Sequence, residues 1–245
     1  MSDTQSAAII LGAGKGTRMK SDLPKVLMPV AGKSMIRHII DTLEQIGVGK
    51  IVTVIAPDGD LVKKEVAPYP TCVQEKQLGT GHAVLSARTE LVGFHGDVLV
   101  IFGDTPLITG ETYQKIIAKR REGYAVVVLG FRPEDPARYG RLVMNEQEEL
   151  ERIVEFKDAT EEEKKIDLCN SGMMCFSGET MFEILGNISN ENAAGEYYLT
   201  DAIEIARRRG LKCTVVEGDK AEVGSANTRE ELALLEQYLN QRKGK

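Results

Sequence analysis

The chain has 245 residues, 42% of them hydrophobic and 28% charged, which is enough to bury a substantial core in one domain. The formal net charge of −6 at pH 7 confines any cationic surface to a local patch, which argues against nucleic-acid binding. Four cysteines without a C-x-x-C pair exclude a disulfide framework or zinc cluster, and the absence of a signal peptide or long apolar run predicts a cytoplasmic, non-membrane protein with buried free thiols.

The first apolar run of the chain ends in a glycine-rich, cationic loop. Residues 7–11 are all apolar, which is typical of a strand buried on both faces. The sequence Gly12-Ala13-Gly14-Lys15-Gly16-Thr17-Arg18 follows, and Pro24-Lys25 comes a few residues later. Glycines allow backbone N–H groups to approach an anion, and the lysines and arginine add positive charge. The pattern predicts a binding site for a polyphosphate.

The two commonest phosphate-binding loops do not match this segment. A dinucleotide fingerprint starting at Gly12 requires glycine at position 17, which is Thr17. A P-loop ending at Gly14-Lys15 requires glycine at position 9 and a hydroxyl at position 16, and the chain has Ile9 and Gly16. The alternative, a loop that only turns the chain, explains the glycines but not the three cations beside them.

Strands and helices are predicted to alternate along the first half of the chain. A helix over residues 35–46, with Ser34 as N-cap and Gly47 as its stop, leads into a buried strand over residues 51–55. The pattern continues with a strand at 71–73, a helix at 82–91, a strand at 98–102, a helix at 111–121 and a strand at 125–131. This order predicts a doubly wound, mainly parallel α/β sheet whose ligands lie outside the carboxyl ends of the strands.

The alternation stops after residue 132. Residues 142–144 and 150–154 predict a β-hairpin, which we interpret as a lid over one side of the site. The charged run 158–165 favours a solvated helix or loop without a functional role. Residues 229–242 predict an amphipathic helix with an apolar face formed by Leu232, Leu235, Tyr238 and Leu239.

The spacing L-G-A-G-K-G-T-R-M…P-K resembles the signature loop of the sugar-1-phosphate nucleotidyltransferases. Four later segments, 74–83, 102–107, 195–201 and 226–227, are similar to the uridyltransferase domains of the bifunctional N-acetylglucosamine-1-phosphate uridyltransferase/acetyltransferase family. The resemblance runs from about residue 7 to the C-terminal helix. It implies a Rossmann-like, glycosyltransferase-A-like fold, with a nucleotidyltransferase domain over residues 1–230 and a C-terminal helix over 231–245.

The implied reaction joins two polyanions, so charge neutralisation is its central requirement. The phosphate of the sugar is already a competent nucleophile, and a Mg²⁺ ion with a few oxygen ligands from the protein is expected. Asp104, at the end of an apolar strand, is the first candidate ligand, although an aspartate before Thr105-Pro106 could also be a turn former. The resemblance implies Asn227 as the second ligand, and Asn227 could also cap the following helix.

Two cations of the first loop have different predicted roles. Lys25 is a compact charge suited to the α-phosphate, and the planar guanidinium of Arg18 suits the leaving pyrophosphate. The resemblance assigns these two residues in the same way. The predicted catalytic residues are therefore Arg18, Lys25 and Asp104, and the alternative for the two cations is a solvated position in the loop.

Base recognition is predicted in the segment that follows residue 73. The Gln74 amide carries a donor and an acceptor that match uracil N3–H and O4, Gly79-Thr80 allows the backbone to approach the ring, and Gln77 lies nearby. Alternatively, the segment is only a polar loop and the start of a helix, which His82 is expected to face. The resemblance implies a substrate-binding set that comprises Leu11, Gly12, Ala13, Gly14, Lys25, Gln74, Gln77, Gly79, Thr80, Phe102, Gly103, Gly140, Glu155, Asn170 and Asn227.

Three functions fit the sequence. The favoured one is Mg²⁺-dependent transfer of UMP from UTP to N-acetylglucosamine 1-phosphate, giving UDP-N-acetylglucosamine and pyrophosphate. The second is nucleotidyl transfer to another sugar-1-phosphate such as glucose 1-phosphate, and the third is a non-catalytic nucleotide-sugar sensor. Because these residues contain no hexapeptide repeats for the left-handed β-helix of the bifunctional relatives, we expect no acetyl transfer and a monomer or weak homo-oligomer.

Overall fold

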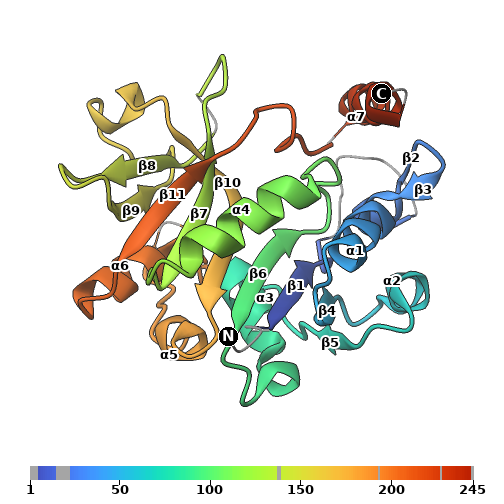
Figure 1. Ribbon diagram of the computed structural model, residues 1–245, viewed down its shortest axis with the longest axis horizontal. Helices are drawn as coiled ribbons and strands as arrows, with labels where there is room; N and C mark the ends of the chain where they lie inside the picture. The colour runs from blue at the N-terminus through green and yellow to red at the C-terminus, as the bar shows by residue number, and fades with distance from the viewer. Residues whose placement is uncertain (1–4, 15–22, 137–138, 193, 227, 244–245) are drawn as a thin grey trace.

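The computed structural model describes residues 5–14, 23–136, 139–192, 194–226 and 228–243. Within these residues, nine strands form one sheet through the middle of the molecule, and helices cover both of its faces (Figure 1). The strands of this sheet are β1 (Ser6–Leu11), β4 (Lys50–Ile55), β5 (Thr71–Val73), β6 (Asp97–Phe102), β7 (Val126–Phe131), β8 (Arg141–Met144), β9 (Leu150–Val154), β10 (Cys169–Ser177) and β11 (Cys213–Glu217). A separate two-stranded ribbon consists of β2 (Pro29–Val30) and β3 (Lys33–Ser34).

The strand order in the sheet is β11-β7-β10-β6-β1-β4-β5. Every pair along this path is parallel except those of β10, which runs antiparallel to both β6 and β7. The doubly wound, mainly parallel sheet predicted from the sequence is confirmed, as is the hairpin, which β8 and β9 form. The hairpin joins the sheet through the pair Cys169–Arg141. The central antiparallel strand β10 and the edge strand β11 were not predicted.

The helices divide between the two faces of the sheet. Side chains at alternate positions of β1 enter different cores, with Ile9 on one face and Ile10 on the other. Because both faces are covered, residues 7–11 of this strand are all apolar rather than alternating with polar residues. One face carries α1 (Met35–Gln45), α2 (Asp60–Val66) and α4 (Gly110–Arg120), and the other carries α3 (Thr80–Ser86), α5 (Met181–Leu185) and α6 (Asp201–Arg208).

Helix α1 has the ends that its sequence predicts. The Ser34 hydroxyl accepts a hydrogen bond from the backbone N–H of Arg37 at 3.2 Å, which caps the first turn. After the last turn the chain passes through Gly47 with a positive φ of 76°. The predicted helix 82–91 is shorter than expected, because α3 ends at Ser86 and a 3₁₀ turn follows over Arg88–Leu91.

The C-terminal helix α7 (Arg229–Lys243) lies beside β2 and β3 (Figure 1). Leu235 and Leu239 are buried in a small core that also contains Val30, Met35 and Leu107. Tyr238 does not belong to this buried face, since 44% of it is exposed, and the prediction was wrong there. At 100° per residue, position 238 lies about 60° from 235 and about 100° from 239 around the helix, which places it at the edge of the buried face.

Two predictions from composition can be compared with the structure. All four cysteines, Cys72, Cys169, Cys175 and Cys213, are buried free thiols, as predicted. Burial raises the pKa of each of these thiols. Among the described residues, none of the helices has the length and apolar character needed to span a membrane.

Candidate functional site

A cavity of about 320 Å³ lies at the carboxyl ends of β1, β5 and β6, and we call it the loop cavity. It contains the start of the first glycine-rich segment, the start of η2 (Lys25–Leu27) and the segment that follows β5. The residues that line it are Leu11, Ala13, Gly14, Lys25, Val26, Gln74, Gln77, Gly79, Thr80, Ala83, Phe102, Asp104 and Glu196. Ten of these thirteen belong to the predicted site, so segments far apart in sequence meet where the motifs indicated.

Lys25 and Asp104 form an ion pair in the loop cavity. Asp104 follows β6 after Gly103, and Lys25 opens η2 directly after Pro24, which fixes the approach of the chain. The two side chains are only 14% and 19% exposed, so their charges are partly shielded from water. A cation and a carboxylate, both of which a metal–triphosphate complex could engage, therefore lie side by side at the cavity wall.

Gly12 and Gly103 support the loop cavity from behind and do not line it. The N–H of Gly12 donates to the carbonyl oxygen of Val54 at 2.8 Å, and that of Gly103 donates to Leu11 at 3.0 Å. The sheet uses the Gly12 N–H in this structure, so this donor does not point into the cavity, and the predicted contact of the loop with an anion would use other backbone groups. A Cβ on Gly12 would lie 3.2 Å from the same Val54 oxygen, so the glycine allows two strand ends to approach closely.

Two glutamines hold residues 74–81, the segment after β5, in place; we call it the base-side segment because the sequence predicts base recognition there. The Gln77 amide nitrogen donates to the Ala13 carbonyl oxygen at 2.5 Å, which ties this segment to the first loop. The Gln74 nitrogen donates to the Gly79 carbonyl oxygen at 3.0 Å and lies 3.2 Å from Nδ1 of His82. The predicted use of both ends of the Gln74 amide on a base is thus wrong for this conformation, because its nitrogen is already engaged.

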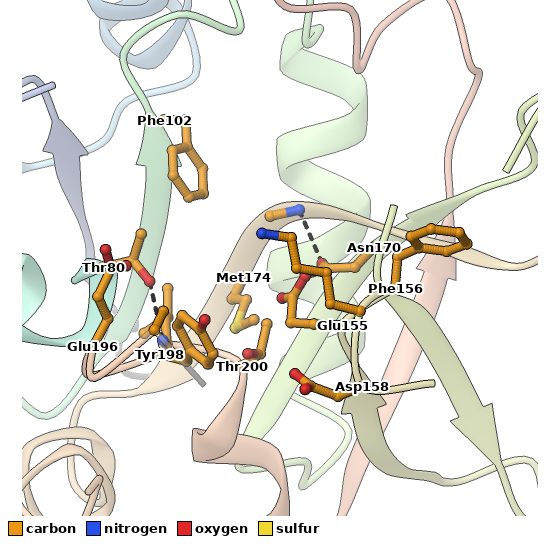
Figure 2. A pocket seen from close by; sticks show the side chains of 14 residues that line it. Thr80, Phe102, Glu155, Phe156, Asp158, Asn170, Met174, Glu196, Tyr198 and Thr200 are labelled. Atoms are coloured by element: carbon orange, nitrogen blue, oxygen red, sulfur yellow. Dashed lines mark hydrogen bonds between the residues drawn. The ribbon is translucent and has the colours of Figure 1, made fainter. Parts of the chain in front are cut away.

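A second cavity of about 600 Å³, the hairpin cavity, lies beside the loop cavity. Thr80, Phe102 and Glu196 line both. Figure 2 shows Thr80, Glu196 and Tyr198 on one side of the hairpin cavity and Glu155 with Asn170 on the other, with Met174 between the two groups. A smaller cavity of about 260 Å³ adjoins the hairpin cavity. Gly140 lines this smaller cavity together with Glu155 and Asn170, and all three belong to the predicted substrate-binding set.

The start of β10 holds the hairpin against the sheet. The N–H of Asn170 donates to the Gly140 carbonyl oxygen at 2.8 Å, and Asn170 Oδ1 accepts from the N–H of Gly172 at 2.9 Å (Figure 2). Gly140 precedes β8 and Glu155 follows β9. The open end of the hairpin therefore faces the hairpin cavity, which places Gly140, Glu155 and Asn170 together as predicted.

The hairpin cavity is acidic. Glu155, Asp158 and Glu196 line it together with one lysine, Lys157. Burial, and then the neighbouring Asp158 and Asp201 carboxylates, raise the pKa of Glu155. Burial also raises the pKa of Tyr198, with the surrounding carboxylates acting in the same direction. Such a wall favours neutral hydroxyl and amide groups of a ligand and disfavours its anionic groups.

Backbone hydrogen bonds join the base-side segment to residues 197–199. The Tyr197 N–H donates to Leu78, and its carbonyl oxygen accepts from Gly81, both at 2.8 Å. The Thr80 hydroxyl accepts from the N–H of Leu199 at 3.0 Å (Figure 2). We call these three bonds the clasp. Because Thr80 lines both cavities, the clasp links the wall of the loop cavity to the wall of the hairpin cavity.

Some predicted residues cannot be placed, and some lining residues were not predicted. Arg18 and Asn227 lie outside the described residues. Glu196 and Tyr198 line the hairpin cavity and belong to the segment 195–201, which the resemblance places around the acetamido side of the sugar. Asp158 also lines this cavity, although the run 158–165 was interpreted as a solvated segment without a role. The resemblance of residues 195–201 was the one signal for Glu196 and Tyr198. Asp158 carries no local signal, because it reaches the cavity only through the turn after β9.

A metal site can be assessed from the donor atoms present. Among the described residues, no group of three or more histidine, cysteine or acidic side chains is placed to hold a metal ion. Mg²⁺ needs few protein ligands when phosphate oxygens and water complete its shell. The single carboxylate of Asp104, at the wall of the loop cavity, is a donor of the right chemistry for such an ion.

Comparison with known proteins identifies the family to which this chain belongs. The chain belongs to the family described as the MobA-like NTP transferase domain, whose profile matches residues 8–166. Two curated relatives are both described as "Bifunctional protein GlmU". The chain is 49% identical to that of Paramagnetospirillum magneticum over 244 residues and 50% identical to that of Rhodospirillum rubrum over 241 residues.

These alignments cover 99% and 98% of the present chain and 54% of each relative. The chain thus spans about half the length of the curated relatives it matches. A crystal structure from Bacillus anthracis, described as a "Putative Glucose-1-Phosphate Thymidylyltransferase", superposes with a TM-score of 0.76 at 22% identity, covering 95% of this chain and 94% of that one. That likeness supports the fold.

Proposed function

We propose that this chain transfers UMP from UTP to N-acetylglucosamine 1-phosphate and releases pyrophosphate. The observation that carries the proposal is the sharing of Phe102, Thr80 and Glu196 by the loop cavity, which contains the Lys25–Asp104 pair, and the acidic hairpin cavity. Two ligands can therefore lie side by side, one against a cation and the other against hydroxyl-binding groups. The match to the NTP transferase family and the similarity to the two GlmU relatives support nucleotidyl transfer to a sugar-1-phosphate.

The reaction requires little covalent help from the protein. An oxygen of the sugar phosphate attacks the α-phosphorus of the triphosphate, the bond to the β-phosphate oxygen breaks, and pyrophosphate leaves. Both reactants are anions, so the protein must align them and offset their repulsion. Lys25, held at the wall of the loop cavity, supplies a fixed positive charge toward the α-phosphate. Arg18 stays the predicted partner of the pyrophosphate.

Asp104 is the residue that we expect to bind Mg²⁺, with Asn227 as the predicted second ligand. When bound, the ion would neutralise phosphate charge that the protein's cations cannot offset alone. Asp104 occupies the same cavity wall as Lys25, so its carboxylate can hold the lysine before substrates arrive. The ammonium group of Lys25 is thereby held at the cavity wall, next to the position that we propose for the α-phosphate.

The base is expected to bind between Gln74 and the start of α3. With the Gln74 nitrogen engaged, its oxygen is the amide atom available to accept from uracil N3–H. Within the described part of the chain, the backbone N–H groups of Gly79 and Thr80 have no acceptor, so they can serve uracil O4.

Charge orients the sugar phosphate. The sugar ring can use its hydroxyl and amide groups on Glu155 and Asn170, while the carboxylates of the hairpin cavity repel the phosphate. The phosphate is therefore directed past Phe102 toward Lys25, which is the direction required for attack on the triphosphate.

Pyrophosphate release across a panel of nucleoside triphosphates and sugar-1-phosphates, with and without Mg²⁺, tests the proposal. We expect release with UTP and N-acetylglucosamine 1-phosphate in the presence of Mg²⁺. Faster release with glucose 1-phosphate would refute the assignment of the sugar. Binding of nucleotide without release for any pair would replace the enzyme with a sensor.

A further inference from the structure

The orientation of the Gln74 amide is set by groups that do not touch the ligand. Gln74 follows β5, is 4% exposed and lines the loop cavity. Its Nε2 donates to the Gly79 carbonyl oxygen at 3.0 Å. Because a carbonyl oxygen only accepts, the nitrogen end of the amide must face Gly79.

His82 provides the second acceptor for the same nitrogen. Nδ1 of His82 lies 3.2 Å from Gln74 Nε2, and since Nε2 is a donor, Nδ1 must be unprotonated. The ring is held in position, because His82 lies in the first turn of α3 and its ring is 6.3 Å from that of Tyr197. The Tyr197 carbonyl oxygen in turn accepts from Gly81, the residue before His82.

The two acceptors use both hydrogens of the Gln74 amide, which leaves Oε1 as the atom presented to the base. Uracil carries a hydrogen on N3 and can donate to this oxygen, whereas N3 of cytosine is an acceptor and faces it with a lone pair. Turning the amide to suit cytosine would break both bonds and place Oε1 against the lone pairs of Gly79 and His82.

We propose that His82 is a positioning residue that sets the preference for UTP over CTP by fixing the Gln74 amide. The inference rests on the proposed nucleotidyl transfer, and it concerns a residue that would touch neither the substrate nor the metal. Loss of the acceptor on His82 would leave the Gly79 carbonyl oxygen as the remaining constraint. The cost of turning the amide would then fall by about one hydrogen bond, which corresponds to roughly 3- to 10-fold in selectivity.

Two substitutions separate the acceptor from the bulk of the ring. In His82→Asn, Oδ1 occupies the position of Nδ1 and keeps an acceptor there, whereas in His82→Gln the polar end lies at the position of Nε2. The measurement is kcat/KM for UTP and for CTP with N-acetylglucosamine 1-phosphate. We expect His82→Gln to lower the UTP/CTP ratio by roughly 3- to 10-fold and His82→Asn to retain it within about 2-fold.

If the wild type prefers UTP and His82→Gln leaves the UTP/CTP ratio unchanged, the inference about His82 is refuted and the proposed function is not affected. A wild type that turns over no UTP would instead overturn the proposed function. Nitrogen-15 NMR of the wild-type protein gives a readout independent of turnover and of variant folding. We expect the His82 resonances of a ring protonated at Nε2 and bare at Nδ1, and a proton on Nδ1 would refute the inference.

Discussion

Gly79→Ala should open the clasp, because a methyl group at this position collides with backbone. Gly79 has a φ of +113°, and a Cβ there would lie 2.6 Å from the Tyr197 carbonyl oxygen and 2.8 Å from its nitrogen. These atoms belong to the two backbone hydrogen bonds that Tyr197 makes with Leu78 and Gly81. Neither atom is the flexible end of a side chain, so the segments must separate.

The expected magnitude has two parts. An alanine at positive φ costs about 1–3 kcal/mol of stability wherever it stands. Weakening the two backbone hydrogen bonds of Tyr197 costs about 0.5–1.5 kcal/mol each, so the collision adds about 1–3 kcal/mol. Gly123→Ala is the matched control, since Gly123 has a φ of +104° and no atom within 4 Å of the position of its Cβ.

Urea unfolding and UTP titration should be run on both variants. Gly79→Ala should be less stable than Gly123→Ala by about 1–3 kcal/mol. It should also bind UTP roughly 5-fold or more weakly, because the fraction of molecules with an intact base-side wall falls. Equal stabilities and equal UTP affinities for the two variants would show that the contact between the base-side segment and Tyr197 holds nothing in place.

Three further outcomes are expected. Lys25→Ala should lower kcat on the order of 10²-fold in a pyrophosphate-release assay. Lys33→Ala, at a more exposed lysine of the β2–β3 ribbon, should leave kcat unchanged. A near wild-type kcat for Lys25→Ala would refute the role proposed for Lys25. Burial raises the pKa of Glu155, so the folded protein binds the proton of this carboxyl group more tightly than the unfolded chain does. The free energy of unfolding should therefore fall as the pH rises from the ordinary glutamate pKa through the raised pKa. Glu155→Gln should remove that part of the pH dependence of urea unfolding, and an unaltered profile would contradict the assignment. Leu235→Ala, at a position 4% exposed, should cost about 2–4 kcal/mol of stability, and Tyr238→Ala, at a position 44% exposed, less than about 1 kcal/mol; equal losses would contradict the packing of α7.

The parallel part of the sheet could be predicted because its signals are local. Residues 7–11 and 98–102 are apolar throughout, and residues 51–55 are apolar except for the buried Thr53, as expected for strands covered on both faces. Strand β10 has no such signal. Ser171 and Gly172 interrupt its apolar pattern, and its pairing register with β7 shifts between Asn170 and Met174. Its central position depends on partners about 40 and 75 residues away, which no local pattern records.

The motifs located the site better than they assigned its hydrogen bonds. Gly12 and Gln74 are where the sequence predicted, next to a cavity at the strand ends. Their donors, however, bind Val54 and Gly79, because the folded chain uses a donor wherever an acceptor comes close. Residue type shows what a side chain can do, and only the tertiary structure shows which of its groups is already engaged.

The antiparallel strand explains how the two cavities come to share one edge of the sheet. The carboxyl ends of β1, β5 and β6 supply the loop cavity, as expected for a doubly wound sheet. Because β10 runs the opposite way, its first residues lie beside the last residues of β7, where Asn170 pairs with Gly130. The start of β10 therefore reaches the site edge.

The hairpin reaches that edge through β10. Its pairing to Cys169 aims its open end, with Gly140 and Glu155, at the same edge. A cation-bearing wall and a carboxylate-bearing wall thus face one another across Phe102, which lines both cavities. Reversing the direction of β10 would carry Asn170 and the hairpin to the far end of the sheet and leave the loop cavity without its neighbour. The orientation of this single strand is therefore what brings the two cavities together for the two substrates that we propose.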